Sequence, residues 1–169
     1  IDIGAKDRDD AVRRGVRVGD PGVIDGKLVE LTEDLIASRA IDNRIGAFVV
    51  LEALRLLADD PPAASVTAVA TAQEEIGYSG GGARTSAYVI DPTVALVVDV
   101  TFATDAPGLE KKELGEHKLG GGPVLSRGSA AHPVVFDRLV AAAEREGIPY
   151  TIAAQARYTA TDADAIYLS

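Results

Sequence analysis

The chain has 169 residues, of which 26 are acidic and 17 basic, giving a formal net charge of −9 and a hydrophobic fraction of 47%. This composition is typical of a globular domain large enough to bury a core without disulfides or a structural metal. The negative balance argues against a nucleic-acid partner, because phosphate binding relies on clustered Lys and Arg, and the absence of Cys excludes a disulfide framework, a Cys nucleophile and thiolate-bound zinc.

Residues 1–36 are rich in Asp, Arg and Gly, with short apolar stretches between glycines and prolines. This pattern predicts small strands and turns. Residues 43–58 then place apolar side chains at close to helical spacing, and two consecutive prolines at 61–62 follow the end of the pattern. We therefore expect a small β-rich part over residues 1–36 and longer elements from residue 37 onward.

Two short runs, 65–71 and 93–100, are apolar and β-branched at successive positions. Strands have this composition when a parallel sheet buries both of their faces. A short helix is expected between the two runs, over residues 80–89. The three elements together predict a strand, helix, strand unit.

Residues 101–128 are rich in loops, with one strand predicted at 123–126. An amphipathic helix is expected over 132–146, with Gly147 as its C-cap, followed by a strand over 150–154. The alternation of strands and helices predicts an α/β domain with a mostly parallel layered sheet and helices on both faces.

No apolar run approaches the ~20 residues that a membrane helix needs, and the first residues lack the pattern of a signal peptide. We expect a cytoplasmic protein without membrane contacts. The chain begins without Met and ends inside a helical pattern at 165–169, so we also expect it to be part of a longer protein.

Carboxylates lie at or just beyond the ends of two of the predicted strands. Glu74 and Glu75 come just after the run at 65–71, and Asp99 lies near the end of the run at 93–100, between two valines. Adjacent parallel strands lie about 4.8 Å apart, and open α/β sheets place their sites beyond the carboxyl ends of the strands. These side chains are therefore expected to converge, and oxygen ligands gathered in this way suit one or two divalent ions.

The same residues could also have purely structural roles. A Glu-Glu pair in a loop is commonly a solvated surface feature. Asp42, directly before the predicted helix, could be its N-cap, and Thr161 or Asp162 could cap a helix in the same way. The two histidines, His117 and His132, lack a second histidine at ligand spacing, so neither is expected to bind a metal.

Several short motifs occur along the chain in a definite order. They are Ile-Asp-Ile-Gly-Ala at 1–5, Gly-Val-Arg-Val-Gly-Asp at 15–20, Ala-Ile-Asp-Asn-Arg-Ile-Gly at 40–46, Gln-Glu-Glu-Ile-Gly at 73–77, Val-Asp-Val-Thr at 98–101, Leu-Gly-Gly-Gly-Pro at 119–123 and Thr-Asp-Ala-Asp-Ala at 161–165. As a set, they resemble the family forty-two metallo-aminopeptidases, the tetrahedral-assembly type that includes glutamyl and deblocking aminopeptidases. The resemblance spans essentially the whole chain.

The resemblance implies an aminopeptidase that removes N-terminal residues from peptides, using water activated by two divalent metal ions, zinc or cobalt. It implies that Asp42 bridges the two ions, that Glu75 binds one of them and Asp99 the other, and that Glu74 is the general base. The family's two remaining ligands are histidines, one upstream and one downstream of the motifs, and neither has a counterpart in this chain.

The family's fold is a zinc-exopeptidase-like domain with a small PDZ-like domain inserted into it. The resemblance therefore implies that residues 1–36 are the C-terminal part of a small β-rich PDZ-like domain and that residues 37–169 are part of the catalytic α/β domain. It also implies a homo-oligomer, a tetrahedral dodecamer. The alternatives are a related co-catalytic zinc exopeptidase or deacylase and, from another class, a non-catalytic structural subunit or fragment.

Overall fold

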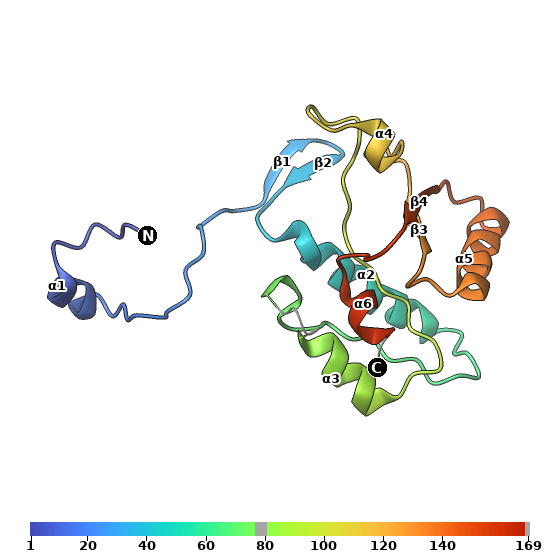
Figure 1. Cartoon of the computed structure of the whole chain (residues 1–169), viewed down its shortest axis with the longest axis horizontal. Helices are drawn as coiled ribbons and strands as arrows, with labels where there is room; N and C mark the ends of the chain where they lie inside the picture. The colour runs from blue at the N-terminus through green and yellow to red at the C-terminus, as the bar shows by residue number, and fades with distance from the viewer. Residues whose placement is uncertain (77–80, 168–169) are drawn as a thin grey trace. The chain divides into compact units, whose positions relative to one another are not determined.

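The computed structural model describes residues 1–76 and 81–167 (Figure 1). The chain forms two compact units, Ile1–Ile41 and Asp42–Ser169. Four positions that belong to predicted elements or motifs lie outside the described residues: 77, 80, 168 and 169. The start of the helix predicted at 80–89 and the end of the helical pattern at 165–169 are therefore not covered.

The first unit contains one short helix and one hairpin. Helix α1 spans Arg8–Arg13, and the side chain of Asp7 caps it by accepting a hydrogen bond from the backbone N–H of Asp10 at 2.8 Å. Strands β1 (Val29–Thr32) and β2 (Leu35–Ala37) pair antiparallel, and all their residues are exposed. The prediction of small strands is right for this hairpin and wrong for α1, where acidic residues cap and begin a helix.

In the second unit several helices precede the two strands, and one helix lies between the strands. Its helices are α2 (Ile41–Leu57), α3 (Gly81–Ile90), α4 (Lys111–Leu114), α5 (Pro133–Arg145) and α6 (Asp162–Ile166), its strands are β3 (Val124–Gly128) and β4 (Thr151–Gln155), and a single 3₁₀ turn, η1, spans Glu74–Ile76. The predicted α/β class is confirmed. In the part of the chain that the structure describes, no helix is long and apolar enough to cross a membrane.

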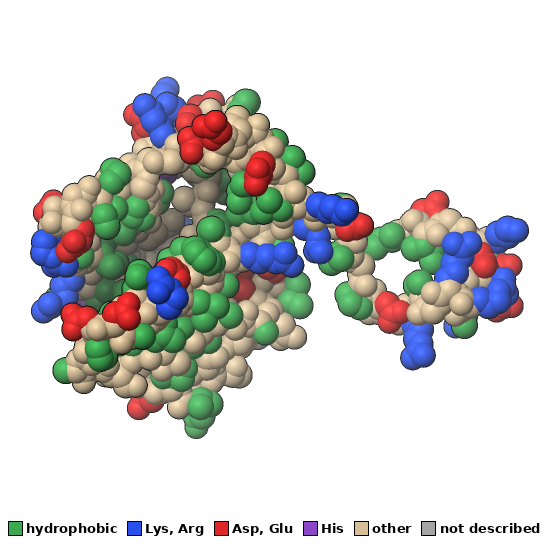
Figure 2. Space-filling model, turned by 180° about the vertical axis from the view of Figure 1, so that it is seen from behind, with side chains coloured by type: hydrophobic (Ala, Val, Ile, Leu, Met, Phe, Trp, Pro, Cys, Tyr) green, Lys and Arg blue, Asp and Glu red, His purple; other side chains and the backbone are tan. Residues whose placement is uncertain are grey.

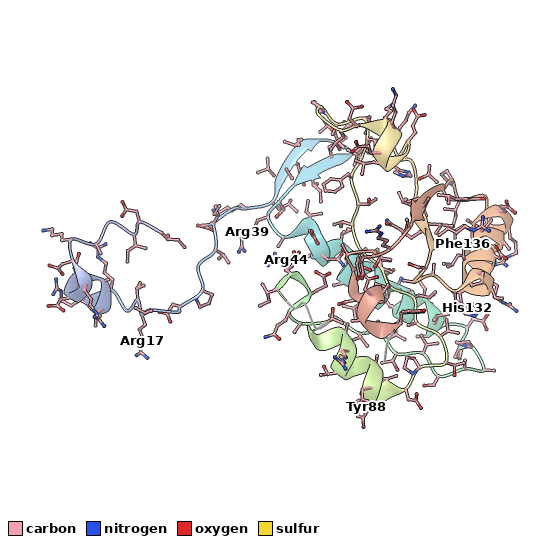
Figure 3. The ribbon with its side chains drawn as sticks, viewed as in Figure 1. Arg17, Arg39, Arg44, Tyr88, His132 and Phe136 are labelled. Carbon is pink, nitrogen blue, oxygen red and sulfur yellow. The ribbon has the colours of Figure 1, made fainter. Side chains whose placement is uncertain are left out.

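β3, α5 and β4 form one βαβ unit. The two strands run parallel and stay in register along their whole length. α5 connects them and packs on β3, burying Phe136 and Ala143. Figure 3 shows Phe136 between α5 and β3, where the guanidinium of Arg127 lies 5.5 Å from the centroid of its ring. The strands predicted at 123–126 and 150–154 and the helix predicted at 132–146 are confirmed here, with ends shifted by one or two residues.

The strands predicted at 65–71 and 93–100 are not formed. A strand needs a hydrogen-bonded neighbour, and β3 and β4 pair only with each other, which leaves both runs without a partner among the described residues. Their apolar side chains are correspondingly open: Val66 is 46%, Val94 56% and Leu96 59% exposed. Within residues 1–76 and 81–167, the predicted mostly parallel sheet is therefore limited to one pair of strands.

Few apolar side chains are fully buried. α3 buries Ala83 and Ala87, which lie one helical turn apart on the same face. α2 confirms the helix predicted at 43–58, yet large apolar side chains on it are exposed, Phe48 among them. Figure 2 shows hydrophobic side chains spread over the visible surface of the larger unit. Amphipathic spacing therefore predicted the helix correctly, while the face it was expected to bury is not covered by the described residues.

A close contact fixes the start of α2 against residues 93–100. A Cβ added at Gly46 would lie 2.7 Å from the carbonyl oxygen of Val98 and would collide with Oδ1 of Asn43. Asn43 donates from Nδ2 to that same Val98 oxygen at 2.9 Å, and its Oδ1 accepts from the Gly46 N–H at 2.9 Å. Glycine is required at position 46 because any side chain would separate the helix from this segment.

We predict that Gly46→Ala lowers the free energy of unfolding by about 1–3 kcal/mol, because the added methyl group must displace backbone or the Asn43 side chain. The higher helix propensity of alanine, about 1 kcal/mol, offsets only part of this loss. Denaturant unfolding measures the difference. Gly26→Ala is the control, since a Cβ there meets only the Arg39 side chain, at 3.7 Å. Equal stability of the two variants would contradict the close contact.

Candidate functional site

Four carboxylates of the second unit lie within electrostatic reach of a fifth, Glu74. Burial raises the pKa of Glu74 most, and repulsion from the other carboxylates raises it further. In decreasing order of effect, these are Asp99, Asp162, Glu75 and Asp42. They come from the start of α2, from η1, from the segment 93–100 and from α6. We call them the carboxylate cluster.

Asp99 experiences the same surroundings. Burial raises the pKa of its carboxyl group most, and the hydrogen bond that the Val100 N–H donates to Oδ1 at 2.8 Å lowers the pKa in part. Asp42 and Asp162 raise it again by repulsion. Like charges held together in a partly buried place favour binding of a proton or a cation, because either one relieves the repulsion.

Asp42 is placed by its neighbour Asn43. The backbone of both residues is non-helical, and the peptide bond between them is cis. The Asn43 side chain bonds to Val98, the residue before Asp99, so the two aspartates are brought together by one amide group. Because Asn43 also accepts from the Gly46 N–H, as an N-cap does, the capping role considered for Asp42 belongs to Asn43. The Asp42 side chain remains exposed.

Glu74 and Glu75 begin η1 directly after a tight bend. Gln73 has a φ of 66°, in the left-handed region, so the chain reverses there. The carbonyl of Ala72 accepts a hydrogen bond from the Gly82 N–H at 2.7 Å, which ties the bend to the first turn of α3. This arrangement leaves Glu74 partly buried and Glu75 exposed.

Asp162 belongs to the cluster, whereas the sequence indicated only a capping role for it. The structure gives the capping role to Thr161, whose side chain accepts from the Ala163 N–H at 3.2 Å. Asp162 instead accepts a hydrogen bond at 2.6 Å from Oγ1 of Thr71. Its position at the start of α6, the helix that follows β4 beyond the carboxyl end of a parallel strand, is the signal that would have found it.

The two histidines have different surroundings. His117 is buried, and its ring nitrogens lie 2.7 Å from Oγ1 of Thr151 and 2.9 Å from the carbonyl oxygen of Leu114. The imidazole therefore links β4 to the end of α4. His132 is exposed and directly precedes α5 (Figure 3).

The donor atoms of the cluster suit a divalent cation only in part. Carboxylate oxygens are good ligands for divalent ions, and a cation would offset the repulsion around Glu74 and Asp99. However, no group of three or more His, Asp or Glu residues within residues 1–76 and 81–167 is arranged to hold a metal ion. The described residues therefore do not form a complete metal site, and the roles of Asp42, Glu75 and Asp99 as ligands stay predictions.

The family model of the M42 glutamyl aminopeptidases matches residues 1–169, so the chain belongs to this family, and the resemblance found in the sequence is confirmed. The lysyl aminopeptidase of Pyrococcus furiosus is 34% identical over 169 residues, an alignment that covers 100% of this chain and 47% of the relative.

Two solved structures resemble the chain in three dimensions. The TET aminopeptidase of the marine sediment archaeon Thaumarchaeota archaeon SCGC AB-539-E09 matches with a TM-score of 0.82 and 34% identity, over 99% of this chain and 47% of that one. PhTET1-12s, described as a dodecamer in the asymmetric unit, matches with a TM-score of 0.69 and 26% identity, over 98% and 49% of the two chains. The chain thus spans about half the length of the proteins it matches.

We predict that Glu74→Gln raises the stability of the metal-free protein near neutral pH and not in acid. The folded-state pKa of Glu74 lies above its ordinary value of 4.5, so ionisation opposes folding as the pH rises through the raised pKa. Below the ordinary value, Glu74 is protonated in both the folded and the unfolded state, and the variant gains nothing.

Thermal unfolding with a chelator present, at about pH 4 and about pH 8, tests this difference. Glu113→Gln, an exposed residue of α4, is the control for the loss of one charge. A gain for Glu74→Gln that is the same at both pH values would contradict the repulsion as its cause.

Proposed function

We propose that this chain contributes to the active site of an aminopeptidase, which hydrolyses the N-terminal residue from peptides with the help of two divalent metal ions, zinc or cobalt. The observation that carries the proposal is that Asp42, Glu75 and Asp99 lie close enough to Glu74 for their charges to raise its pKa. These are the residues that the family resemblance implicated, and membership of the M42 family supports the same activity.

In this proposal Asp42 would be shared by the two ions, Glu75 would bind one of them and Asp99 would bind the other. The raised pKa values of Glu74 and Asp99 support a place for positive charge beside them. The histidines that complete the family's ligand set belong to parts of the protein outside this sequence, which agrees with a chain about half as long as its relatives.

Two divalent ions supply Lewis acidity, which makes a water molecule a stronger nucleophile and a peptide carbonyl a better electrophile. The chain's own contribution is proton transfer. A carboxylate oxygen of Glu74 accepts the proton of the attacking water and delivers it to the leaving amine, a step worth about 10²–10⁴ in rate. In the metal-free protein, partial burial and repulsion from the neighbouring carboxylates raise the pKa of Glu74.

The remaining predictions from the sequence are part of the same proposal. Residues 1–36 are the C-terminal part of a small PDZ-like domain, and residues 37–169 are part of the catalytic domain. The protein is a cytoplasmic homo-oligomer, and the likeness to PhTET1-12s, described as a dodecamer, supports an assembly of that kind.

We predict that Glu74→Gln in the complete protein retains its metal and lowers kcat by about 10²–10⁴-fold, because the amide keeps the shape of the side chain and cannot accept the proton. Metal content by elemental analysis and turnover of an aminoacyl substrate are measured on the same preparation. Glu113→Gln should behave as the unaltered protein. Unchanged turnover at unchanged metal content would remove Glu74 from the mechanism and favour a non-catalytic role for the cluster.

Asp42→Asn should lose both metal and activity. A bridging ligand holds two ions, so its replacement should weaken binding by more than the roughly 10–100-fold that loss of an outer-shell partner costs. Titration calorimetry with zinc or cobalt measures the affinity, and Asp60→Asn, an exposed residue after α2, is the control. Unweakened metal binding in Asp42→Asn would contradict its assignment as a ligand.

A further inference from the structure

One hydrogen bond joins two parts of the carboxylate cluster that are far apart in the sequence. Oγ1 of Thr71 donates to Oδ2 of Asp162 at 2.6 Å, across 91 residues, in a partly buried place. Thr71 ends the apolar run 65–71, and only two residues separate it from Glu74. The bond therefore connects α6 to the segment that carries Glu74.

The segment 71–74 is held from a second side by α3. The carbonyl of Ala72 accepts from the Gly82 N–H at 2.7 Å, and a Cβ at Gly82 would lie 2.6 Å from the backbone nitrogen of Ala72. α3 also contacts α6 directly. Thr71 contacts α6, Ala72 contacts α3, and the two helices contact each other. The bend at Gln73 follows directly and leads to Glu74.

Hydrogen bonds made by its neighbours fix the position of Asp162. Next to it, Thr161 caps α6, and its Oγ1 lies 2.8 Å from Oγ1 of Thr159. The carboxylate of Asp164 accepts from the backbone N–H groups of Thr159 and Ala160, each at 3.0 Å. The connection before α6 is therefore fixed by side-chain to backbone bonds, and the direction in which Asp162 presents its carboxylate is fixed with it.

We propose that Thr71 and Asp162 are positioning residues, whose hydrogen bond holds Glu74 at the place from which it transfers the proton. This inference rests on the proposed function of Glu74. A catalytic base must be held within hydrogen-bond reach of the proton it takes, so a small displacement of its segment reduces kcat. A role in stability alone would instead lower the stability of the fold and leave turnover of the folded enzyme unchanged.

The test uses the complete, metal-loaded protein and three variants. Thr71→Val removes the donor and keeps the shape, Thr71→Ser keeps the donor, and Thr104→Val removes a buried hydroxyl that bonds to the backbone of His117. We expect Thr71→Val to lower kcat by about tenfold or more, with KM and metal content changed by less than about twofold. Thr71→Ser should restore kcat, and Thr104→Val should lower the melting temperature without lowering kcat.

Backbone hydrogen exchange gives a readout that does not depend on activity. Amides in residues 72–76 should exchange faster in Thr71→Val than in the unaltered protein, and Thr71→Ser should return them to the original rate. Unchanged exchange and unchanged kcat in Thr71→Val would overturn the proposal. Loss of metal from Thr71→Val, or a loss of kcat in Thr104→Val as large as that in Thr71→Val, would also overturn it.

Failure of the proposed function has a different signature. Glu74→Gln could keep full turnover while Thr71→Val still speeds exchange in residues 72–76. In that case the hydrogen bond fixes the segment, but Glu74 is not the base, so the positioning role in catalysis is wrong as well. If Glu74→Gln loses turnover and Thr71→Val does not, the proposed function stands and only the positioning role is wrong.

Discussion

Repulsion between carboxylates is the constraint on which the arrangement around Glu74 and Asp99 depends. Five acidic side chains share one region, and burial and mutual repulsion raise the pKa of both Glu74 and Asp99. Such a group separates unless the backbone around it is tied together. The ties are short polar contacts made by uncharged side chains: Asn43 to the Val98 carbonyl, and Thr71 to Asp162. The repulsion between these side chains thus lowers local stability. Charged groups held together in this way are common at functional sites.

The same constraint explains the use of small residues around the cluster. Gly46 allows α2 to approach the carbonyl of Val98, and Gly82 allows α3 to approach Ala72. At both places a helix start contacts backbone rather than side chains, so the polar backbone groups can be satisfied at short range. The apolar faces of the second unit, by contrast, are largely open within the described residues. The cluster is therefore held by polar contacts more than by a packed core.

Local patterns predicted local elements well. Periodicity over 43–58 and 132–146 found α2 and α5. The position of Glu74, Glu75 and Asp99 at the ends of apolar runs indicated that these carboxylates lie near one another, and the charges of Glu75 and Asp99 do affect Glu74. The failures were non-local. Pairing of a strand depends on a neighbour, which the composition of 65–71 and 93–100 does not reveal. Asp162 was missed as a cluster member because the pattern at 161–165 also fits a helix cap, and its contact with Thr71 is not visible in the sequence.

The sequence separation of these ties has a consequence for the order of folding. β3, α5 and β4 are contiguous in the chain and in contact, so they can form with little loss of loop entropy. The Asn43–Val98 and Thr71–Asp162 bonds instead close loops of 55 and 91 residues. We infer that the carboxylates meet only after the βαβ unit has formed, so the early steps of folding proceed without the cost of bringing like charges together.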